Sequence, residues 1–447
     1  MPEERKLFEN FPPVTTGEWT EKIKADLKGE DFEKLVRISP EGLRIMPFYR
    51  QEDIEGLTAI NTLPGESPWL RSGKSSGNNW LIRQDIKVAD YNEANRKALD
   101  ILMKGVDSIG FEIDNPDSLS TESIGKLLDG IHPESIEINF RSEGKARELL
   151  AYFIGVINSR KTKHEEIRGA FEADPLGRLF MNGKLCIPSE DGFVYLAALT
   201  KEASVLPSFR VIQVNGHWLA NAGADPVKEL AIALAMGNEY LSILTGRGIS
   251  ADLAASKMRF SFATGPDYFL EIARLRAARL LWSLVTEAYK PENEANTRME
   301  IHSVTGEWNK RVTDPYVNML RTQTEAMSAV LGGADSLTVN PFDKTFRVPD
   351  EFSERIARNQ QLLLREEAYF SKVSDPAGGS WYIEKLSSMV ADEAWKTFLK
   401  IESDGGFLAA LEKGYIKSLV DEGSAKREAF LAMTDSLYQK GKRRDQE

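Results

Sequence analysis

The chain has 447 residues, of which 42% are hydrophobic and 28% charged, and its formal net charge is -11. This composition is that of a globular protein that can bury a large core, which excludes a mostly disordered chain. The acidic balance and the lack of a long basic stripe argue against nucleic-acid binding, because contact with a phosphate backbone requires clustered Lys and Arg.

The N-terminus and the single cysteine both bear on location. Residues 1–6 begin acidic and lead into Pro12-Pro13 without an apolar segment, so the sequence predicts neither a secretory signal nor a membrane anchor. Cys186 cannot form an internal disulfide, and its apolar neighbours favour a small buried hydrophobe over a nucleophile. With no Cys/His cluster for zinc either, we expect a cytoplasmic protein without a metal site.

Residues 1–77 are predicted to form an N-terminal arm. Helical pieces are expected at 20–27 and 31–36, and the Gly/Ser-rich stretch at 73–77 has the composition of a flexible linker. That stretch does not complete the spacing of a phosphate-binding loop.

From about residue 80 onward, short apolar or β-branched runs alternate with longer segments of helical period, which is typical of βα units. Such a series suits a closed barrel or a doubly wound open sheet. The count of eight runs favours the barrel, and no G-x-G-x-x-G follows the first run. We therefore predict a (β/α)8 TIM barrel within residues 78–345, with strands at 80–86, 108–114, 135–140, 167–171, 209–216, 257–265, 298–306 and 335–341.

Three of the barrel helices are predicted to begin after an aspartate that can cap them. Asp225-Pro226 opens a helix that ends at Gly246, Asp267 caps a helix over 268–289, and Asp314-Pro315 opens one over 316–331. Residues 346–447 should then supply the last barrel helix and a helical tail. The tail prediction places helices at 351–370, 387–401 and 407–433, and a solvated charged end at 441–447.

Six short motifs occur in a fixed order in the second half of the chain, and a weaker one occurs at 80–84. Together they resemble the acyl-CoA mutases, and within them the methylmalonyl-CoA mutase family. The resemblance implies an adenosylcobalamin-dependent isomerase that interconverts methylmalonyl-CoA and succinyl-CoA, with the CoA chain threaded along the barrel axis. The six motifs are Ala222-Gly223-Ala224-Asp225-Pro226, Arg276-Ala277-Ala278-Arg279-Leu280-Leu281-Trp282, Asp314-Pro315-Tyr316-Val317-Asn318, Leu331-Gly332-Gly333, Arg355-Ile356-Ala357-Arg358-Asn359 and Asp375-Pro376-Ala377-Gly378-Gly379-Ser380.

The chain departs from the catalytic members of that family after its fourth and fifth strands. Catalytic chains end strand five with Gly-Tyr-His, whereas this chain has Gly216-His217-Trp218. Because side chains alternate along a strand, the shift by one position turns His217 away and puts Trp218 in its place. The Thr- and Gln-containing motif after strand four is absent from 171–177.

Strand seven and the arm depart as well. His302 and Ser303 match the family's His-Ser-Gln-Thr, but Val304 replaces the Gln and cannot hydrogen-bond a ligand. The family's Pro-Tyr-Pro-Thr segment is replaced by 73–77. We therefore assign no confident catalytic residue and keep His217, Trp218 and His302 as remnant candidates.

Each of these residues also has a purely structural interpretation. For His217, a hydrogen-bonded residue at the barrel rim is favoured over a displaced acid-base group. His302 is either a remnant that faces the ligand or a residue that fills the barrel mouth, and we leave both open. Trp218 either plugs the axis or packs in the core, and both interpretations predict a narrowed barrel. His132 and His164 are expected at the surface.

Cobalamin domains of this family carry Asp-x-His-x-x-Gly, whose imidazole binds cobalt. None of the four histidines of this chain has an Asp two residues before it. We therefore expect no cobalamin-binding domain in these 447 residues, and adenosylcobalamin bound by a partner subunit instead. The sequence favours the small, non-catalytic subunit of a heterodimer, which stabilises the large catalytic subunit and meets acyl-CoA only through the complex.

Two alternatives to the non-catalytic subunit stay open. One is a catalytically competent acyl-CoA mutase barrel that uses a separately encoded cobalamin-binding subunit. The other is a barrel enzyme of unrelated chemistry that uses His302 and carboxylates at the rim.

Overall fold

The computed structural model describes residues 13–142, 144–185 and 189–444, so Cys186 lies outside the described residues. Eight parallel strands close into a barrel in the order β10-β3-β4-β5-β6-β7-β8-β9, which confirms the predicted (β/α)8 fold. Their bounds lie close to the predicted ones, because apolar runs between helical segments mark buried parallel strands well. They are β3 Leu81–Val88, β4 Ser108–Ile113, β5 Glu137–Ser142, β6 Arg168–Ala173, β7 Phe209–Asn215, β8 Met258–Thr264, β9 Ile301–Thr305 and β10 Ser336–Thr338.

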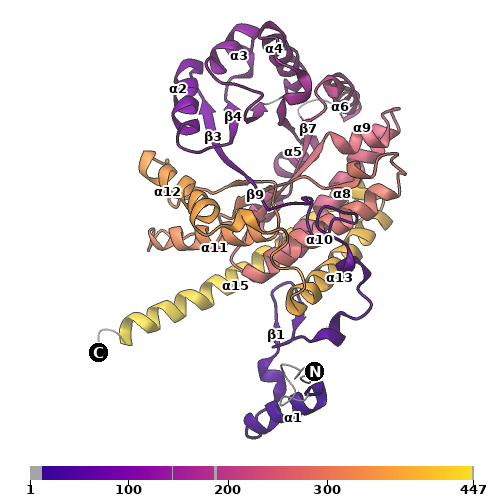
Figure 1. Cartoon of the computed structure of the whole chain (residues 1–447), viewed down its shortest axis with the longest axis vertical. Coiled ribbons are helices and arrows are strands. Elements are labelled where there is room, and N and C mark those ends of the chain that lie inside the picture. Colours follow the sequence, from indigo (N-terminus) through magenta and orange to yellow (C-terminus); the bar gives the residue numbers. More distant parts are fainter. Residues whose placement is uncertain (1–12, 143, 186–188, 445–447) are drawn as a thin grey trace, which may run out of the picture.

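Helices cover the outside of this barrel (Figure 1). The side chains of Asp225 and Asp267 cap α8 and α10 as predicted. The barrel helices are α2 Tyr91–Leu102, α3 Thr121–Leu127, α4 Ala146–Ser159, α5 Pro175–Asn182, α6 Ser189–Glu202, α7 Gly216–Ala222, α8 Pro226–Thr245, α9 Ala251–Ser256, α10 Tyr268–Glu287, α11 Val317–Leu331 and α12 Glu351–Leu362.

The predicted capping role of Asp314 was wrong. The helix begins at Val317, and its N-cap residue Tyr316 makes no side-chain cap bond. Asn318, in the first turn of α11, stabilises this end of the helix instead. Its side-chain amide donates to the carbonyl oxygens of Arg311 and Phe342 at 2.9 and 3.0 Å.

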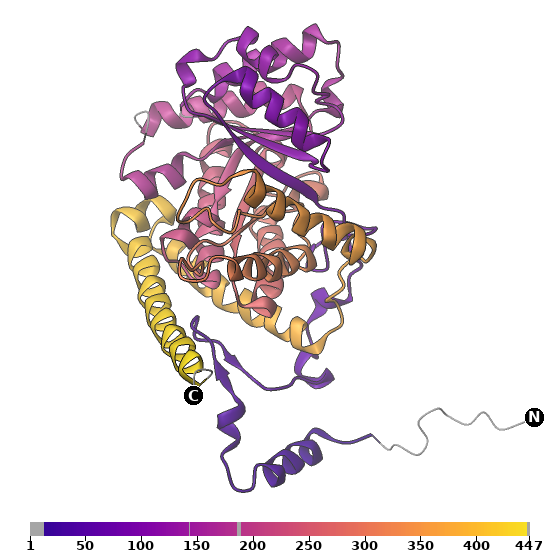
Figure 2. The ribbon, with the colours of Figure 1, turned by 90° about the vertical axis from the view of Figure 1, so that its left-hand side faces the viewer.

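The first part of the N-terminal arm, with α1, extends away from the barrel (Figures 1 and 2), whereas Leu43, Ile45 and Tyr49 of the arm pack in the core. The arm contains α1 Thr16–Asp26, the 3-10 turns Phe32–Leu35, Gln51–Ile54 and Thr58–Asn61, and the small hairpin of β1 Arg37–Ile38 and β2 Arg44–Ile45. The stretch 73–77 is bound to the body rather than loose: Nζ of Lys74 donates to the Ala334 carbonyl at 2.7 Å, and Oγ of Ser374 donates to the Gly77 carbonyl at 2.9 Å. The prediction of a flexible linker, which rested on composition, was therefore wrong. The residues that bind this stretch lie far away in the sequence, so composition could not reveal them.

The tail consists of α13 Trp381–Ser403, α14 Gly406–Glu412 and α15 Tyr415–Arg444. Helix α13 packs against α8 and α10, and α15 packs against α7 and α8 before its C-terminal half extends outward (Figure 1). Residues 441–444, within the expected solvated charged end, continue the helix α15, since Lys and Arg are good helix formers and favourable at a helix C-terminus. Within the described part of the chain, no helix combines the length and apolarity needed to cross a membrane.

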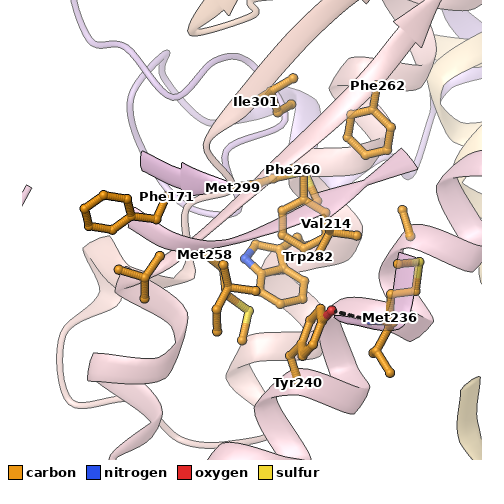
Figure 3. Packing of buried hydrophobic residues seen from close by; sticks show 14 of the residues in the cluster. Phe171, Val214, Met236, Tyr240, Met258, Phe260, Phe262, Trp282, Met299 and Ile301 are labelled. Atoms are coloured by element: carbon orange, nitrogen blue, oxygen red, sulfur yellow. Dashed lines mark hydrogen bonds between the residues drawn. The ribbon is translucent and has the colours of Figure 1, made fainter. Parts of the chain in front are cut away.

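The core between the strands and the outer helices is densely packed around Trp282 of α10. Its ring lies 4.6 Å from that of Phe260 on β8, and Tyr240 and Met236 of α8 close the same region (Figure 3). A Cβ atom added at Gly237 of α8 would lie 2.7 Å from ring atoms of both Phe260 and Trp282. The glycine therefore lets α8 approach the barrel closely.

Replacing Gly237 by Ala is expected to lower the free energy of unfolding by about 1–2 kcal/mol. Overpacking between two rigid rings should cost about 2–3 kcal/mol, the upper part of the usual range, and this exceeds the gain of about 1 kcal/mol in helix propensity. Gly125→Ala in α3 is the matched control, because nothing lies within 4 Å of its added Cβ, and it should stabilise the protein instead. Urea denaturation measures both, and equal stability of the two variants would contradict the packing argument.

Candidate functional site

Polar and charged side chains occupy the interior of the barrel, where an acyl-CoA mutase barrel is expected to hold its substrate. They come from alternate positions of the strands, so their apolar neighbours face the surrounding helices. The main members are Arg83 on β3, Glu137 on β5, Glu172 on β6, Gln213 on β7 and Arg259 on β8. All five are buried.

Two arginines reach across the barrel. The guanidinium of Arg259 lies 3.2 Å from Oε1 of Glu172 and 3.3 Å from Oε1 of Glu137. The guanidinium of Arg83 lies 2.6 Å from Oε1 of the same Glu172. Since β3 and β6, and likewise β5 and β8, are three strands apart in a ring of eight, these ion pairs span the interior.

Glu172 is the centre of this interior network. Arg141 also donates to it, with NH2 2.7 Å from Oε2, and the side chains of Glu172, Arg83 and Arg259 are 1%, 2% and 0% exposed. Burial alone would raise the pKa of Glu172, but Arg83, Arg141 and Arg259 together hold that pKa well below its usual value. The carboxylate is therefore ionised and bound on both oxygens.

His217 does not lie on a strand. Strand β7 ends at Asn215, and residues 216–222 form the short helix α7, so the alternation of side chains assumed for this position does not apply. Nδ1 of His217 lies 2.6 Å from Oγ of Ser261 on β8. Burial, with Arg141 as the next cause, lowers the pKa of His217 to about 3, so the imidazole is neutral.

His302 lies on β9, beside Ser261 in the strand register. Nδ1 of His302 is 2.8 Å from Oγ of Ser336 on β10, and the residue is 2% exposed. Burial, with Arg83 and Arg259 as further causes, lowers its pKa well below the usual value. The structure thus places both His217, in α7, and His302, on β9, beside Ser261 of β8, and each is hydrogen-bonded to a serine.

Trp218 lies outside the network that fills the axis. Its ring is partly buried, 5.8 Å from the ring of His217, and it packs over Gly177 of α5. The axis is narrowed by charged side chains rather than by an indole. His132 is exposed beside Glu134, and His164 is partly exposed beside Asn158, as expected for surface residues.

The two buried neutral histidines and the buried carboxylate of Glu172 make the fold sensitive to acid. A histidine whose pKa is depressed on folding contributes stability above its unfolded pKa of about 6.5, and this is lost as the pH falls toward the folded value of about 3 for His217. Glu172, also depressed, loses its contribution below about pH 4.3. We therefore expect the melting temperature to fall steadily below about pH 6.5, and a melting temperature constant from pH 7 to pH 4 would contradict it.

Sequence reasoning did not identify Arg83, Glu137, Glu172 and Arg259 as a site. A signal was present, since parallel barrel strands are usually apolar on both faces. Polar residues recur at every second position in β5 (Glu137, Asn139, Arg141) and in β7 (Gln213, Asn215). That period indicates a polar barrel interior.

The side chains present do not fit cobalamin binding through a histidine. His217 and His302 are buried with serine partners, and His132 and His164 lie on the outer surface. All four imidazoles have hydrogen-bond partners within this chain, so we derive no step through that cofactor here.

The fold and this interior define a (β/α)8 barrel protein whose axis is crossed by buried ion pairs. The chain belongs to the methylmalonyl-CoA mutase family, whose sequence model matches residues 38–123 and 118–437, and this confirms the family predicted from its motifs. It is 43% identical to the methylmalonyl-CoA mutase small subunit of Porphyromonas gingivalis, over 98% of this chain and 70% of that protein.

Other relatives carry the family name with lower identity. Methylmalonyl-CoA mutase of Rhizobium meliloti is 33% identical over 91% of this chain and 60% of its own length. The methylmalonyl-CoA mutase large subunit of Streptomyces virginiae is 30% identical over 94% of this chain and 60% of its own length. The chain thus spans between 60% and 70% of the length of these three relatives.

Proposed function

We propose that this chain is the small, non-catalytic subunit of an adenosylcobalamin-dependent methylmalonyl-CoA mutase, and that it stabilises the large catalytic subunit. The observation that carries the proposal is the pair of ion bridges from Arg83 and Arg259 across the barrel interior. A CoA chain could follow the axis only by displacing Glu172 from its arginines. Leaving charges buried without partners costs several kcal/mol, so substrate binding there is strongly disfavoured.

The acid-base groups of the interior also support a non-catalytic role. His217 and His302 are held neutral, each against a serine, and their depressed pKa values leave no imidazolium to polarise a thioester near neutral pH. Under this proposal, adenosylcobalamin and the reacting acyl-CoA are bound by the large subunit. The alternative of a competent barrel that borrows a cobalamin-binding subunit meets the same obstacle in the axis.

The arm supplies the contact surface for the partner. Helix α1 has no buried residue, and Trp19, Leu35 and Ile38 along the arm are 49%, 41% and 63% exposed. Large apolar side chains at this exposure on an extended segment are typical of a surface that is covered in a complex. We infer that the arm packs on the large subunit.

Coexpression with a large subunit tests the proposal. We expect the two chains to purify together and the large subunit to melt at a higher temperature in the complex. The chain alone, given methylmalonyl-CoA and adenosylcobalamin, should form no succinyl-CoA, either by itself or with a separate cobalamin-binding subunit. Turnover in either mixture would overturn the non-catalytic role, and failure to copurify would overturn the subunit role.

Trp19→Ala is expected to weaken the complex by about 2 kcal/mol, roughly thirtyfold in Kd, because a large aromatic anchor dominates such interfaces. Met103→Ala is the matched control, since Met103 is 88% exposed at the end of α2, away from the arm. Binding of both variants to the large subunit can be measured by calorimetry. Equal affinities would contradict a role for the arm.

A further inference from the structure

A cavity of about 510 Å³ lies outside the barrel axis, beside the C-terminal ends of β8 and β9. Its walls come from segments far apart in the sequence: the β1–β2 hairpin, the first turns of α8 and α10, the start of α13, and α15. Gly265 and Gly306 follow the two strands and form part of the wall. This volume is in the range of about 300–1,000 Å³ that is usual for small-molecule sites.

Aromatic rings form much of the cavity wall. Phe269 lies 5.6 Å from Tyr382 and 5.3 Å from Tyr268, so these three rings make one continuous side. Trp308 and Phe430, with ring centroids 6.3 Å apart, line the cavity as well. Rings in this number bind the apolar body of a ligand, and their faces attract cations.

The cations in the wall already have partners. Arg37 donates to Asp267 at 2.7 Å, and Nζ of Lys426 lies 2.7 Å from Glu422. The Arg427 guanidinium lies 4.8 Å from the centre of the Trp308 ring and donates to the backbone carbonyl of Ala224 at 2.5 Å. An anionic ligand would have to break one of these contacts.

Most carboxylates in the wall are also engaged. Glu229 and Glu271 both bind Arg274, and each accepts a backbone N–H, from Ala263 and Gly265 respectively.

Glu41, on the hairpin, differs from them. Its Oε2 is buried and accepts no hydrogen bond from the residues that the structure describes. Burial raises the pKa of Glu41, a hydrogen bond with the Ser39 side chain lowers it, and the nearby carboxylates of Asp225 and Asp267 raise it further.

We propose that this cavity binds a small organic monocation, an amine with an aromatic or branched apolar body, whose ammonium group pairs with Glu41 while its body lies among the rings. The free acceptor and the aromatic wall both favour this class. CoA esters carry several negative charges and do not suit a site that binds a cation. The proposed site is therefore separate from the one that binds the substrate of the family.

Titration calorimetry of the full chain tests the proposal with phenethylamine as the probe. Phenethyl alcohol and 3-phenylpropionate serve as the neutral and anionic comparisons. We expect one amine to bind per chain, with the alcohol and the acid at least about tenfold weaker, because the charge-assisted bond to Glu41 is lost.

Two variants show where the amine binds. Glu41→Gln should weaken it at least about tenfold, whereas Glu52→Gln, an exposed arm position outside the cavity, should not change the affinity. The melting temperature of each variant shows whether it is folded. The proposal is overturned if phenethylamine does not bind, if the alcohol or the acid binds as tightly, or if folded Glu41→Gln binds normally.

Discussion

Glu172→Gln is expected to lower the free energy of unfolding by about 3–5 kcal/mol, the usual cost of removing one partner from a buried ion network. The side chain keeps its shape, but Arg83, Arg141 and Arg259 lose the carboxylate that they share. The two fully buried cations, Arg83 and Arg259, and the half-buried Arg141 would then surround a neutral amide. Because native domains are stable by only about 5–15 kcal/mol, the variant should be close to unfolding at room temperature.

Glu112→Gln is the matched control for this experiment. Glu112 pairs with Arg141 at 2.6 Å on β4, but its side chain is 28% exposed, so solvent compensates for the loss. We expect a change below about 1 kcal/mol. Urea unfolding measures the free energy of unfolding of both variants, and so compares a buried with a half-exposed partner of the same Arg141. Similar losses of stability in the two variants would contradict the central role of Glu172.

The barrel could be predicted from the sequence because each strand carries a local signal. A run such as 209–216, with apolar residues at 209, 211, 212 and 214 and helical segments on both sides, is long enough for one strand and too short for a helix. The helix caps at Asp225 and Asp267 are equally local, since the side chain and the amide that it binds are three residues apart.

The interior network could not be predicted in the same way. Which residue of β3 meets which residue of β6 depends on the stagger of the closed barrel, and no local pattern contains that information. The predicted side-chain direction of His217 was wrong for a related reason. The strand ends one residue earlier than predicted, and a helical turn follows in place of the assumed alternation. The sequence shows that Trp218 is large, and for that reason it was considered as a residue that could fill the barrel axis. The sequence does not show that Arg83 pairs with Glu172.

The motifs that carry the family resemblance have a structural role that their sequence does not reveal. Arg276, from the motif on α10, is fully buried and pairs with Asp375, from the motif before α13, and with Glu384 at 2.7 Å. Asp375 also accepts from Nε of Arg71 at 2.5 Å, just before the barrel begins. Two motifs separated by about a hundred residues thus join the arm, the barrel and the tail at one point.

Arg276→Met should therefore destabilise the protein by about 3–5 kcal/mol, since it leaves the carboxylates of Asp375 and Glu384 buried, with Arg71 as the remaining cation. The tail should loosen first, because Glu384 lies in the first turn of α13. Limited proteolysis before α13 then reports the local effect, and urea unfolding the global one. Arg355→Met is the matched control, as Arg355 belongs to another family motif but is exposed, and we expect a change within about 0.5 kcal/mol.

The double variant Arg276→Met with Glu384→Leu separates the two contributions of this ion pair. If the loss in Arg276→Met comes from a buried carboxylate without a partner, removing Glu384 as well should restore part of the stability, since an apolar pair can replace a buried ion pair at little cost. Asp375 loses Arg276 but keeps Arg71 in both the single Arg276→Met variant and the double variant, so the two differ only at Glu384. Additive losses in the two single variants would instead mean that each side chain stabilises the tail through separate contacts.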